Sequence, residues 1–559
     1  MDPGGRPFAG GGGSVDGGEE RARSPVLMSV ALAVVAFIWL LPGLGRVGLT
    51  WDEPRYFDSA SRIQEWTAAV TRGPERRSLA SAERIREVWD AEHYWNPHPP
   101  VYKEGMALAE WISSRWLDPI RGFRLASLVW FALLVGGATW VGGRVWGTTS
   151  GAAAGLSLLL LPRAVGHAHI AATDTPLTLF WFVASAGLAL YLLEGRRGYL
   201  VVGAVGLGLA MGTKFTGYLL PLPLLGWLLV YRRSARAALA FVGWIAGGLA
   251  VSYLLNPLAW HDPAGYAARL FSESLSRQES VPINTYYLGT QYEYVVPWHH
   301  PIVMTVVTVP LALLVLAIFG AARSLARPGR NAMGGLCLAM IVFFWALLAL
   351  PSSPNHDGVR LFLPMFPFLA LLAGRGFGAF HARLGRVLPA RAGVLATLLL
   401  GLLFFYPPYL QLTRIAPFYL SYYNEVIGGP RGAARIGMEV SYWYDAVTPD
   451  FLERVNEYLP EDAQLATFPR SDYFRSLQAY RLLREDIRIS QEWPPPYYLL
   501  VARKAVFGAR EWGIYNNVRP VLAAAVDEVE LVGLYVWKES GEPGQPGPKT
   551  ASRRRQEEH

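Results

Sequence analysis

The sequence predicts a polytopic α-helical membrane protein with about eleven or more spans, interfacial helices in its first outer loop, and a small C-terminal α/β extracytoplasmic domain. Three observations predict this class. Of the 559 residues, 52% are hydrophobic and only 17% are charged, whereas soluble domains carry about 25% charged residues. Apolar runs close to the ~20 residues that a bilayer needs recur along the chain. Arginines fall between these runs, as basic residues do in the loops of membrane proteins.

Composition also excludes other classes of protein. The chain has one cysteine, Cys337, inside an apolar run, so it can form no internal disulfide and no metal site built on several cysteines. The formal net charge is +8, and such a charge is also found in nucleic-acid-binding proteins. Because the arginines are spread between apolar runs, we expect membrane lipids as partners and no nucleic acid.

The N-terminus predicts a tail followed by a span. Residues 1–24 are rich in glycine with mixed charge, which predicts a disordered cytoplasmic tail. The apolar run 26–44 follows Arg21 and Arg23 and is long enough to span a bilayer. A cleaved signal peptide is the alternative, since it also places basic residues before an apolar stretch. We favour an uncleaved span, because no small-residue cleavage site precedes the segment that begins at Gly45.

Ten further apolar runs predict the rest of a transmembrane domain over 25–410. They cover 124–143, 150–162, 175–193, 199–213, 215–230, 237–255, 302–320, 333–350, 361–380 and 389–410. The runs 150–162 and 199–213 are short, so an adjacent pair can also be one broken helix or a re-entrant pair.

Arginine counts predict the topology. With the N-terminus inside, the short arginine-bearing loops all fall on the cytoplasmic side. The outward segments are then 45–123, 163–174, 213–215, 256–301, 351–360 and 411–559. These segments are long and rich in Trp, Tyr, His, Pro and acids, so we expect the chemistry on the extracytoplasmic face.

The outward segments at both ends of the transmembrane domain have patterns of their own. In the first outer loop, 45–123, apolar residues recur on one face of 53–72 and of 81–92, which predicts two helices lying flat at the interface. The region 411–538 loses the membrane pattern and predicts the α/β domain. Its expected helices are 449–459 and 471–485, and its expected strands are 463–468, 497–502 and 529–537. The tail 539–559 is expected to be disordered.

Acidic residues mark the ends of two predicted spans. Asp52 and Glu53 directly follow the first span, and adjacent acids at a membrane exit are costly to bury, which indicates a function. The alternative is structural, with Asp52 capping a helix and Glu53 favouring its dipole. Asp174 opens a later span, where a helix cap is again the alternative.

Basic residues lie on the other outward stretches. His98 and Lys103, five residues apart, can together hold a phosphate. Lys214 lies at an outward turn between two spans, and Arg360 offers a bidentate fork for phosphate with His356 beside it. The alternative for each is an interfacial anchor or a snorkelling side chain. Two of the five lysines in the chain are among these positions.

Two more stretches belong to the same face. His167 and His169 can bind a metal as a pair, but no further ligand stands near them in the sequence, so a divalent metal is possible but not indicated. The stretches 422–429 and 439–443 place polar groups between aromatic rings. This arrangement suits a sugar or a lipid headgroup, and a turn at a domain boundary is the alternative.

Together these motifs resemble the GT-C superfamily, and within it the bacterial enzymes of the protein O-mannosyltransferase and aminoarabinose-transferase type. The resemblance covers residues 26–430 at intervals. It rests on Asp52-Glu53, His98-Pro99-Pro100 with Lys103, Asp174-Thr175-Pro176-Leu177, the turn from Gly208 to Lys214, the run from His356 to Pro367, and Tyr422-Tyr423-Asn424-Glu425. Val101-Tyr102 stands where the family has x-Gly before the lysine, and 411–559 carries no motif that we can assign.

The resemblance implies a glycosyltransferase of the inner (plasma) membrane. Its donor would be a hexose such as mannose, or a pentose, on a polyprenyl or dolichyl phosphate, and its acceptor a hydroxyl of a protein, lipid or glycan. No cofactor is required, because the donor already carries an activated bond.

The resemblance also implies roles for single residues. Asp52 would be the base, and Glu53 and Asp174 would orient the acceptor or the sugar, or keep Asp52 ionised. The phosphate of the donor would be held by Lys103, Lys214, Arg360, His98 and His356, and the sugar or acceptor would be contacted by Tyr56, Tyr102, Asn424 and Glu425. One carboxylate without a covalent partner implies single displacement with inversion.

The main alternative is a polytopic lipid or solute transporter or flippase with an outer binding domain. Transporters place charges near mid-membrane and show two-fold repeats. Here the ionisable groups gather on one face and no repeat of fixed period is visible. A structural membrane protein with an outer binding domain is a further alternative, in which these acids would be idle.

Overall fold

The computed structural model describes residues 15–72, 76–90, 98–276, 283–293, 295–326, 331–351, 353–469 and 471–537. Residues 1–14 of the predicted N-terminal tail and all of the predicted tail 539–559 lie outside this part. The first helix, α1 (Val15–Leu40), begins inside the predicted tail, so residues 15–24 are helical.

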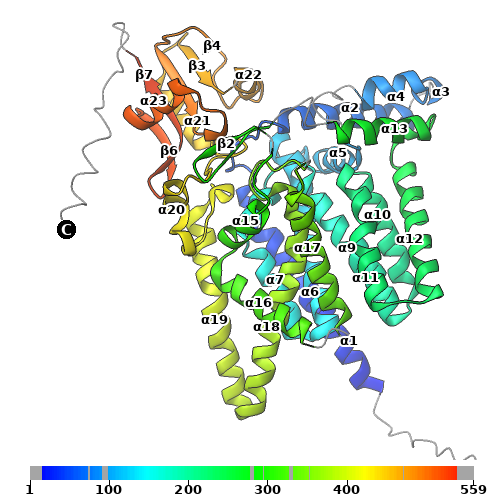
Figure 1. Ribbon diagram of the computed structural model, residues 1–559. Coiled ribbons are helices and arrows are strands. Elements are labelled where there is room, and N and C mark those ends of the chain that lie inside the picture. Colours follow the sequence, from blue (N-terminus) through cyan, green and yellow to red (C-terminus); the bar gives the residue numbers. More distant parts are fainter. Residues whose placement is uncertain are drawn as a thin grey trace, which may run out of the picture.

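A bundle of apolar helices forms the body of the molecule (Figure 1). After α1 its members are α6 (Pro119–Trp146), α7 (Thr148–Leu159), α9 (Asp174–Glu194), α10 (Arg197–Met211), α11 (Pro221–Tyr231), α12 (Ala235–Leu254), α15 (His300–Thr308), α16 (Leu311–Leu325), α17 (Ala332–Ala349), α18 (Phe366–Val387) and α19 (Ala390–Ile415). Most predicted apolar runs correspond to one of these helices, whereas the run 302–320 is divided between α15 and α16. The runs 215–230 and 361–380 each begin in a 3-10 helix, Phe215–Leu219 and Arg360–Met365, before α11 and α18.

Fewer helices than predicted meet the length of a full span. Within the described residues seven helices are long and apolar enough to cross a membrane, or eight if α15 and α16, bent by 118° at their break, form one span. Besides α15 and α16, three bundle helices, α7, α10 and α11, are also shorter than 18 residues. The count of eleven spans therefore stays a prediction.

Small residues allow several of these helices to pack closely. A Cβ on Gly151 of α7 would lie 2.3 Å from the carbonyl oxygen of Thr139 on α6, and a Cβ on Gly187 of α9 would lie 2.6 Å from Cα of Gly203 on α10. Without a side chain at these points the backbones can touch, as is common in membrane helix pairs. The second contact packs α9, whose first residue belongs to the candidate site, against α10.

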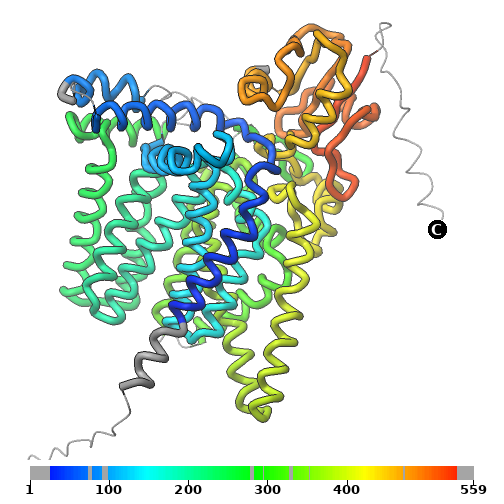
Figure 2. The backbone as a smooth tube through the Cα atoms, turned by 180° about the vertical axis from the view of Figure 1, so that it is seen from behind, coloured from blue at the N-terminus to red at the C-terminus, as the bar shows by residue number. Residues whose placement is uncertain are grey.

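Short amphipathic helices lie across one end of the bundle (Figures 1 and 2). They are α2 (Glu53–Arg72), α3 (Arg76–Leu79), α4 (Ala82–Trp89), α5 (Val101–Ser113) and α13 (Pro263–Leu275). The prediction for 53–72 matches α2, whereas α4 ends at Trp89 rather than at 92. The helices α5 and α13 were not predicted. On α5, Leu108, Trp111 and Ile112 are exposed apolar side chains, as expected for a helix in contact with lipid.

The C-terminal region folds into an α/β unit around a five-stranded sheet with the order β4-β3-β5-β7-β6. Its elements are α21 (Pro449–Tyr458), β3 (Gln464–Phe468), α22 (Ser471–Ala479), β4 (Arg488–Ser490), β5 (Tyr497–Val501), α23 (Ala509–Asn517), β6 (Leu522–Val526) and β7 (Val529–Val536). Strand β3 is parallel to β4 and β5, and β7 is antiparallel to β5 and β6. The three predicted strands correspond to β3, β5 and β7.

The C-terminal unit lies at the same end of the bundle as α2 (Figure 1). The segment that leads into it is hydrogen-bonded to the chain just after the first span, where the Gly48 amide donates to the Asp445 carbonyl at 2.9 Å. A short hairpin of β1 (Thr285–Tyr287) and β2 (Thr290–Tyr292) adds a second contact, since Gln291 Nε2 donates to the Lys504 carbonyl at 2.7 Å. Segments that the topology assigns to the outer face therefore meet in space.

Candidate functional site

Four charged side chains from four separate segments meet at this end of the bundle. Arg360 donates through Nε to Oδ2 of Asp174 at 2.9 Å and through Nη2 to Oδ2 of Asp52 at 3.2 Å. The Nζ of Lys214 donates to Oδ1 of Asp174 at 2.9 Å. Arg360, Asp174 and Lys214 are buried, whereas the Asp52 side chain is 21% exposed. We call these four residues the ionic cluster, and Asp52 is its accessible member.

Local structure explains how each member reaches the ionic cluster. Asp52 directly precedes α2, Asp174 is the first residue of α9, and Lys214 lies between α10 and the short helix η2 (Phe215–Leu219). Arg360 begins the 3-10 helix η5 (Arg360–Met365). Before it, Asp357 and Gly358 take positive φ angles of 54° and 69°, a left-handed turn that glycine accommodates without strain. All four residues thus stand where a helix starts or a turn closes.

A second carboxylate extends the network towards the C-terminal unit. Oδ2 of Asp357 accepts from Arg360 Nη1 at 3.3 Å and contacts His356 Nδ1 at 3.0 Å, and Oδ1 accepts from Arg503 Nη1 at 3.0 Å. Burial opposes the charge of Asp357, but Arg503, His356 and Arg360 outweigh it and hold its pKa well below the usual range. Burial lowers the pKa of His356, and its hydrogen bond to Asp357 opposes this shift.

One aromatic residue of the C-terminal region contacts both an acid and a base of the ionic cluster. The indole Nε1 of Trp443 donates to Oδ2 of Asp52 at 2.9 Å. The guanidinium carbon of Arg360 lies 3.6 Å from the centroid of the same ring, a close cation–π contact.

Two tyrosines border the ionic cluster on the side of α2 and α5. The rings of Tyr56 and Tyr102 pack edge to face with centroids 5.4 Å apart. Burial, reinforced by Asp52 and opposed by Arg360, raises the pKa of Tyr56 well above its usual value, so its phenol stays protonated. Both rings are buried beside the ionic cluster.

Lys103 and Lys214 are connected through their backbones. Lys103 is buried on α5, with Nζ 5.8 Å from the Tyr102 ring centroid. Two residues before Lys103, the Val101 amide donates to the carbonyl of Gly212, which is two residues before Lys214, at 2.8 Å. A Cβ on Gly212 would lie 2.5 Å from Cγ2 of Val101, so only glycine allows this approach. His98 stands just before α5 and is half-buried.

The structure gives Glu53 a different place from the one expected. Its carboxylate is fully buried and forms two 2.7 Å bonds with Nε and Nη2 of Arg124. It also accepts from the amides of Thr50 at 2.8 Å and Ala171 at 2.9 Å. With these oxygens engaged inside the protein, the geometry favours a role in fixing the start of α2 and not the expected role in orienting a substrate.

Asn424 and Glu425 also lie apart from the ionic cluster. The side-chain amide of Asn424 donates to the carbonyls of Val306 and Val309 at 2.6 and 2.7 Å, and so anchors this loop to the end of α15. Glu425 is exposed and accepts from Gln411 at 3.0 Å. These contacts do not favour the expected role of either residue in binding sugar or acceptor.

Within the described part of the chain, no three His, Cys, Asp or Glu side chains are grouped so that they could hold a metal ion. Both ring nitrogens of His169 contact backbone carbonyls, of Val165 at 2.8 Å and of Leu40 at 3.0 Å. The neighbouring histidine, His167, packs against Trp443 with ring centroids 6.1 Å apart. The pair His167 and His169 therefore does not form a metal site in this geometry.

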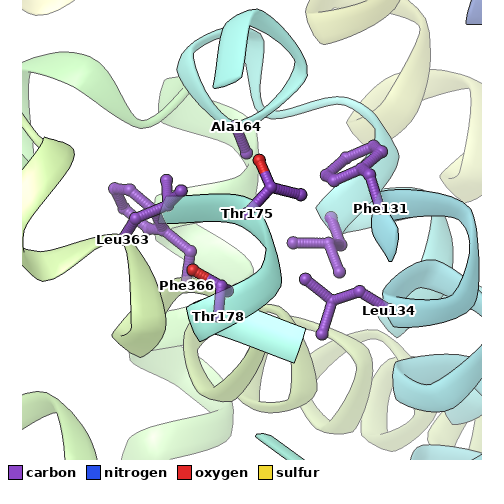
Figure 3. Close-up of a pocket in the computed structure, with 8 residues that line it drawn as sticks. Phe131, Leu134, Ala164, Thr175, Thr178, Leu363 and Phe366 are labelled. Atoms are coloured by element: carbon purple, nitrogen blue, oxygen red, sulfur yellow. The ribbon is translucent and has the colours of Figure 1, made fainter. Parts of the chain in front are cut away.

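A small apolar cavity of about 10 Å³ lies beside the start of α9 (Figure 3), which is room for about one water molecule. Its lining consists of Phe131, Leu134, Leu158, Ala164, Thr175, Thr178, Leu363 and Phe366. The hydroxyls of Thr175 and Thr178 donate to the carbonyls of His167 and Asp174, so the cavity offers few free polar groups. It has room for neither a sugar nor a prenyl chain.

Sequence reasoning missed several residues of this site. Trp443 was noted only as part of an aromatic stretch, and Asp357 only as part of a motif. The partner of Asp357, Arg503, lies in the C-terminal unit, where no motif was assigned. Arg124 carried a usable signal, because a charge that opens an apolar helix needs a partner.

Comparisons with solved structures give remote matches. The apo structure of ArnT from Cupriavidus metallidurans matches with 17% identity and a TM-score of 0.48 over 93% of this chain and 98% of that chain. The same protein bound to undecaprenyl phosphate matches with 15% identity and a TM-score of 0.44 over 91% and 97%. The oligosaccharyltransferase AglB from Archaeoglobus fulgidus, in complex with an inhibitory peptide and a dolichol-phosphate, matches with 13% identity and a TM-score of 0.46 over 85% and 69%.

Comparison by sequence gives one family. No curated protein sequence matches the chain significantly. Residues 98–260 match the family model described as dolichyl-phosphate-mannose-protein mannosyltransferase. This segment contains Lys103, Asp174 and Lys214, while Asp52 and Arg360 lie outside it. Over residues 98–260, this match confirms the resemblance to protein O-mannosyltransferases that the sequence motifs predict.

Proposed function

We propose that the protein is a multi-pass glycosyltransferase of the inner (plasma) membrane, which moves a sugar from a polyprenyl-phosphate donor to a hydroxyl of an acceptor. The observation that carries the proposal is the ionic cluster, in which the accessible acid Asp52 pairs with the buried Arg360, and Arg360 shares Asp174 with the buried Lys214. It lies among segments that the topology assigns to the extracytoplasmic face. The family match over 98–260 supports a donor of this class.

The cations of the ionic cluster would hold the donor phosphate. Nη1 and Nη2 of Arg360 donate to Asp357 and Asp52 at 3.3 and 3.2 Å, longer than its 2.9 Å bond to Asp174. Phosphate oxygens accept such paired N–H groups well and can replace these longer bonds, while Nε stays on Asp174. Lys214 and Lys103 would add positive charge as the phosphate leaves.

Asp52 would act as the general base. The acceptor oxygen attacks the anomeric carbon, and the bond from that carbon to the phosphate oxygen breaks. The acceptor proton moves to Asp52, and the polyprenyl phosphate leaves with the electron pair of the broken bond. Because one displacement occurs without a covalent intermediate, the anomeric configuration inverts. Positive charge at the departing phosphate lowers the barrier, and no cofactor is needed.

Tyr56 and Tyr102 would contact the sugar or the acceptor beside Asp52. Aromatic rings with a polar edge present both an apolar face and a hydroxyl to a ligand. The donor sugar is a hexose such as mannose, or a pentose, and either fits this proposal.

The test compares the parent chain with Asp52→Asn in proteoliposomes that contain a polyprenyl-phosphate sugar and an acceptor. Asparagine keeps an acceptor for the Trp443 N–H but cannot take a proton, so we expect transfer to fall at least about a hundredfold. Asp58→Asn is the matched control, because Asp58 is an exposed acid on α2, the helix that Asp52 directly precedes, and it is paired with Arg62. Transfer by Asp52→Asn within tenfold of the parent would remove Asp52 from the role of base.

A parent chain that forms no glycosylated product with any lipid-linked sugar would contradict the proposal as a whole. Movement of the lipid across the bilayer without product would instead favour the transporter or flippase alternative.

A further inference from the structure

We infer that Trp443 is a positioning residue for the transfer reaction, which holds the Asp52 carboxylate with its indole N–H and the Arg360 guanidinium with its ring face. This inference rests on the proposed function and gives a specific role to Trp443, which the sequence marked only as part of the aromatic stretch 439–443. The supporting observations are the 2.9 Å bond from Nε1 to Asp52 Oδ2 and the 3.6 Å contact of Arg360 with the same ring. The Trp443 side chain is buried.

The contact of Trp443 with Arg360 serves the binding of the donor phosphate, and its bond to Asp52 serves the removal of the acceptor proton. A cation–π contact uses the face of the guanidinium and none of its N–H groups. Arg360 can therefore stay on the ring while its Nη atoms exchange the carboxylates of Asp52 and Asp357 for a phosphate. The Trp443 ring fixes the plane of the Arg360 guanidinium before the donor binds. This preorganisation reduces the conformational entropy that Arg360 loses when the donor phosphate binds.

The indole N–H determines which oxygen of Asp52 is available as a base. Both Trp443 and Arg360 donate to Oδ2. Among the residues that the structure describes, none donates a hydrogen bond to Oδ1 of Asp52. When a phosphate draws the Nη2 of Arg360 away, Trp443 still holds Oδ2. Oδ1 then remains the free oxygen, in a fixed orientation towards the acceptor proton, and a misplaced base would slow transfer without affecting the donor.

The position of Trp443 is itself fixed by its neighbours. Its carbonyl accepts from the Trp51 amide at 3.3 Å, next to Asp52, so base and indole lie on adjacent backbone segments. Arg503, on the C-terminal unit, donates to the carbonyl of the preceding residue, Tyr442, at 2.6 Å. The C-terminal unit therefore contributes to the site through the backbone of this segment.

The test uses Trp443→Phe, which keeps a ring but removes the N–H, and Trp443→Leu, which removes both contacts. For Trp443→Phe we expect kcat to fall by about tenfold to a hundredfold, the worth of a hydrogen bond to a charged group, with the donor KM within about twofold. For Trp443→Leu we expect the same loss in kcat and, in addition, about tenfold weaker binding of a polyprenyl phosphate without sugar. The matched control is Trp116→Phe, because Trp116 is exposed at the end of α5.

A second readout needs no turnover. A carbodiimide with glycine ethyl ester labels carboxyl groups, and peptide mass spectrometry locates the label. We expect Asp52 to be labelled several-fold faster in Trp443→Phe than in the parent, with no change at the exposed Asp58.

The outcomes separate this inference from the proposed function. If the parent transfers sugar and Trp443→Phe keeps kcat within twofold, the positioning role is wrong and the proposed function stands. If the parent transfers no sugar, the proposed function fails. The comparison of Asp52 labelling between the parent and Trp443→Phe then tests whether Trp443 positions the Asp52 carboxylate. Equal labelling in parent and Trp443→Phe would overturn the positioning role.

Discussion

Asp174 is the acid whose loss should disturb the protein most, because it neutralises two buried cations at once. Its two oxygens accept from Lys214 Nζ and Arg360 Nε, both at 2.9 Å. Among the residues that the structure describes, Asp174 is the one carboxylate within 4 Å of Lys214. Removing one partner of a buried ion pair typically costs about 3–5 kcal/mol, since the remaining charge stays out of water. We therefore expect Asp174→Asn to lower the free energy of unfolding by about 3–5 kcal/mol.

Charge balance provides the control for this prediction. Three carboxylates of the network face three cations: Asp52, Asp174 and Asp357 on one side, and Lys214, Arg360 and Arg503 on the other. Asp174→Asn leaves an excess of one positive charge, and adding Lys214→Met restores the balance. The double variant should therefore recover part of the stability that Asp174→Asn loses.

The measurement is equilibrium unfolding of the purified protein in mixed detergent micelles, for the parent, Asp174→Asn, Lys214→Met and the double variant. Equal stability of Asp174→Asn and the parent, within about 1 kcal/mol, would refute the argument that burial makes this acid indispensable. A double variant less stable than Asp174→Asn alone would refute the charge-balance reasoning.

Three further predictions concern groups around the ionic cluster. Glu53→Ala should leave Arg124 buried without its acid and lower the free energy of unfolding by about 3–5 kcal/mol, and adding Arg124→Met should recover part of this loss in the same unfolding assay. Arg503→Met should free Asp357 Oδ1 and lower kcat about tenfold in proteoliposomes, whereas an unchanged kcat would show that the C-terminal unit does not support the site through this bond. Burial raises the pKa of Asp445 to about 7, so its contribution to stability is present below about pH 4 and is lost as pH rises through about 7. Asp445→Asn should therefore unfold at a higher temperature than the parent at pH 8 but not at pH 4, and identical pH profiles of Tm would contradict this assignment.

The sequence predicted the long apolar helices and the meeting of the site residues at one face, because both follow from local patterns in the sequence. Length and composition identify an apolar helix, and arginine counts fix its direction. Once the directions are known, residues at the outer ends of different spans must lie near one face. Asp52, Asp174, Lys214 and Arg360 were expected together on this reasoning, and they form the ionic cluster.

The contacts of individual side chains within the site could not be predicted from the sequence in the same way. Asp52 and Glu53 are adjacent, but α2 begins between them, so their side chains point in different directions and only Asp52 reaches Arg360. Trp443 and Asp52 are 391 residues apart in the chain, and no periodic pattern encodes a contact over that distance. Asn424 resembled a binding residue because a buried amide that caps a loop and one that binds a sugar look alike in sequence.

The smaller elements were missed for a related reason. The helix α5 has 13 residues, a length that is too short for a span, and its apolar residues are divided between the protein and the lipid. Strand β6 (LAAAV) is mostly alanine, which has low strand propensity, and it is held in place by its pairing with β7.

The hydrogen bond between Val101 and Gly212 connects the lipid-facing helix α5 to the turn that carries Lys214 of the ionic cluster. Leu108, Trp111 and Ile112 on α5 are exposed where lipid would cover them, and the first residue of the same helix is bonded to the turn that carries Lys214. A change in bilayer thickness or lipid packing would move α5. Because α5 is bonded to the turn at Gly212, this movement would shift the buried ammonium group of Lys214. The lipid around the molecule is thus mechanically connected to its chemistry, and sugar transfer should depend on acyl-chain length even when every substrate is saturating.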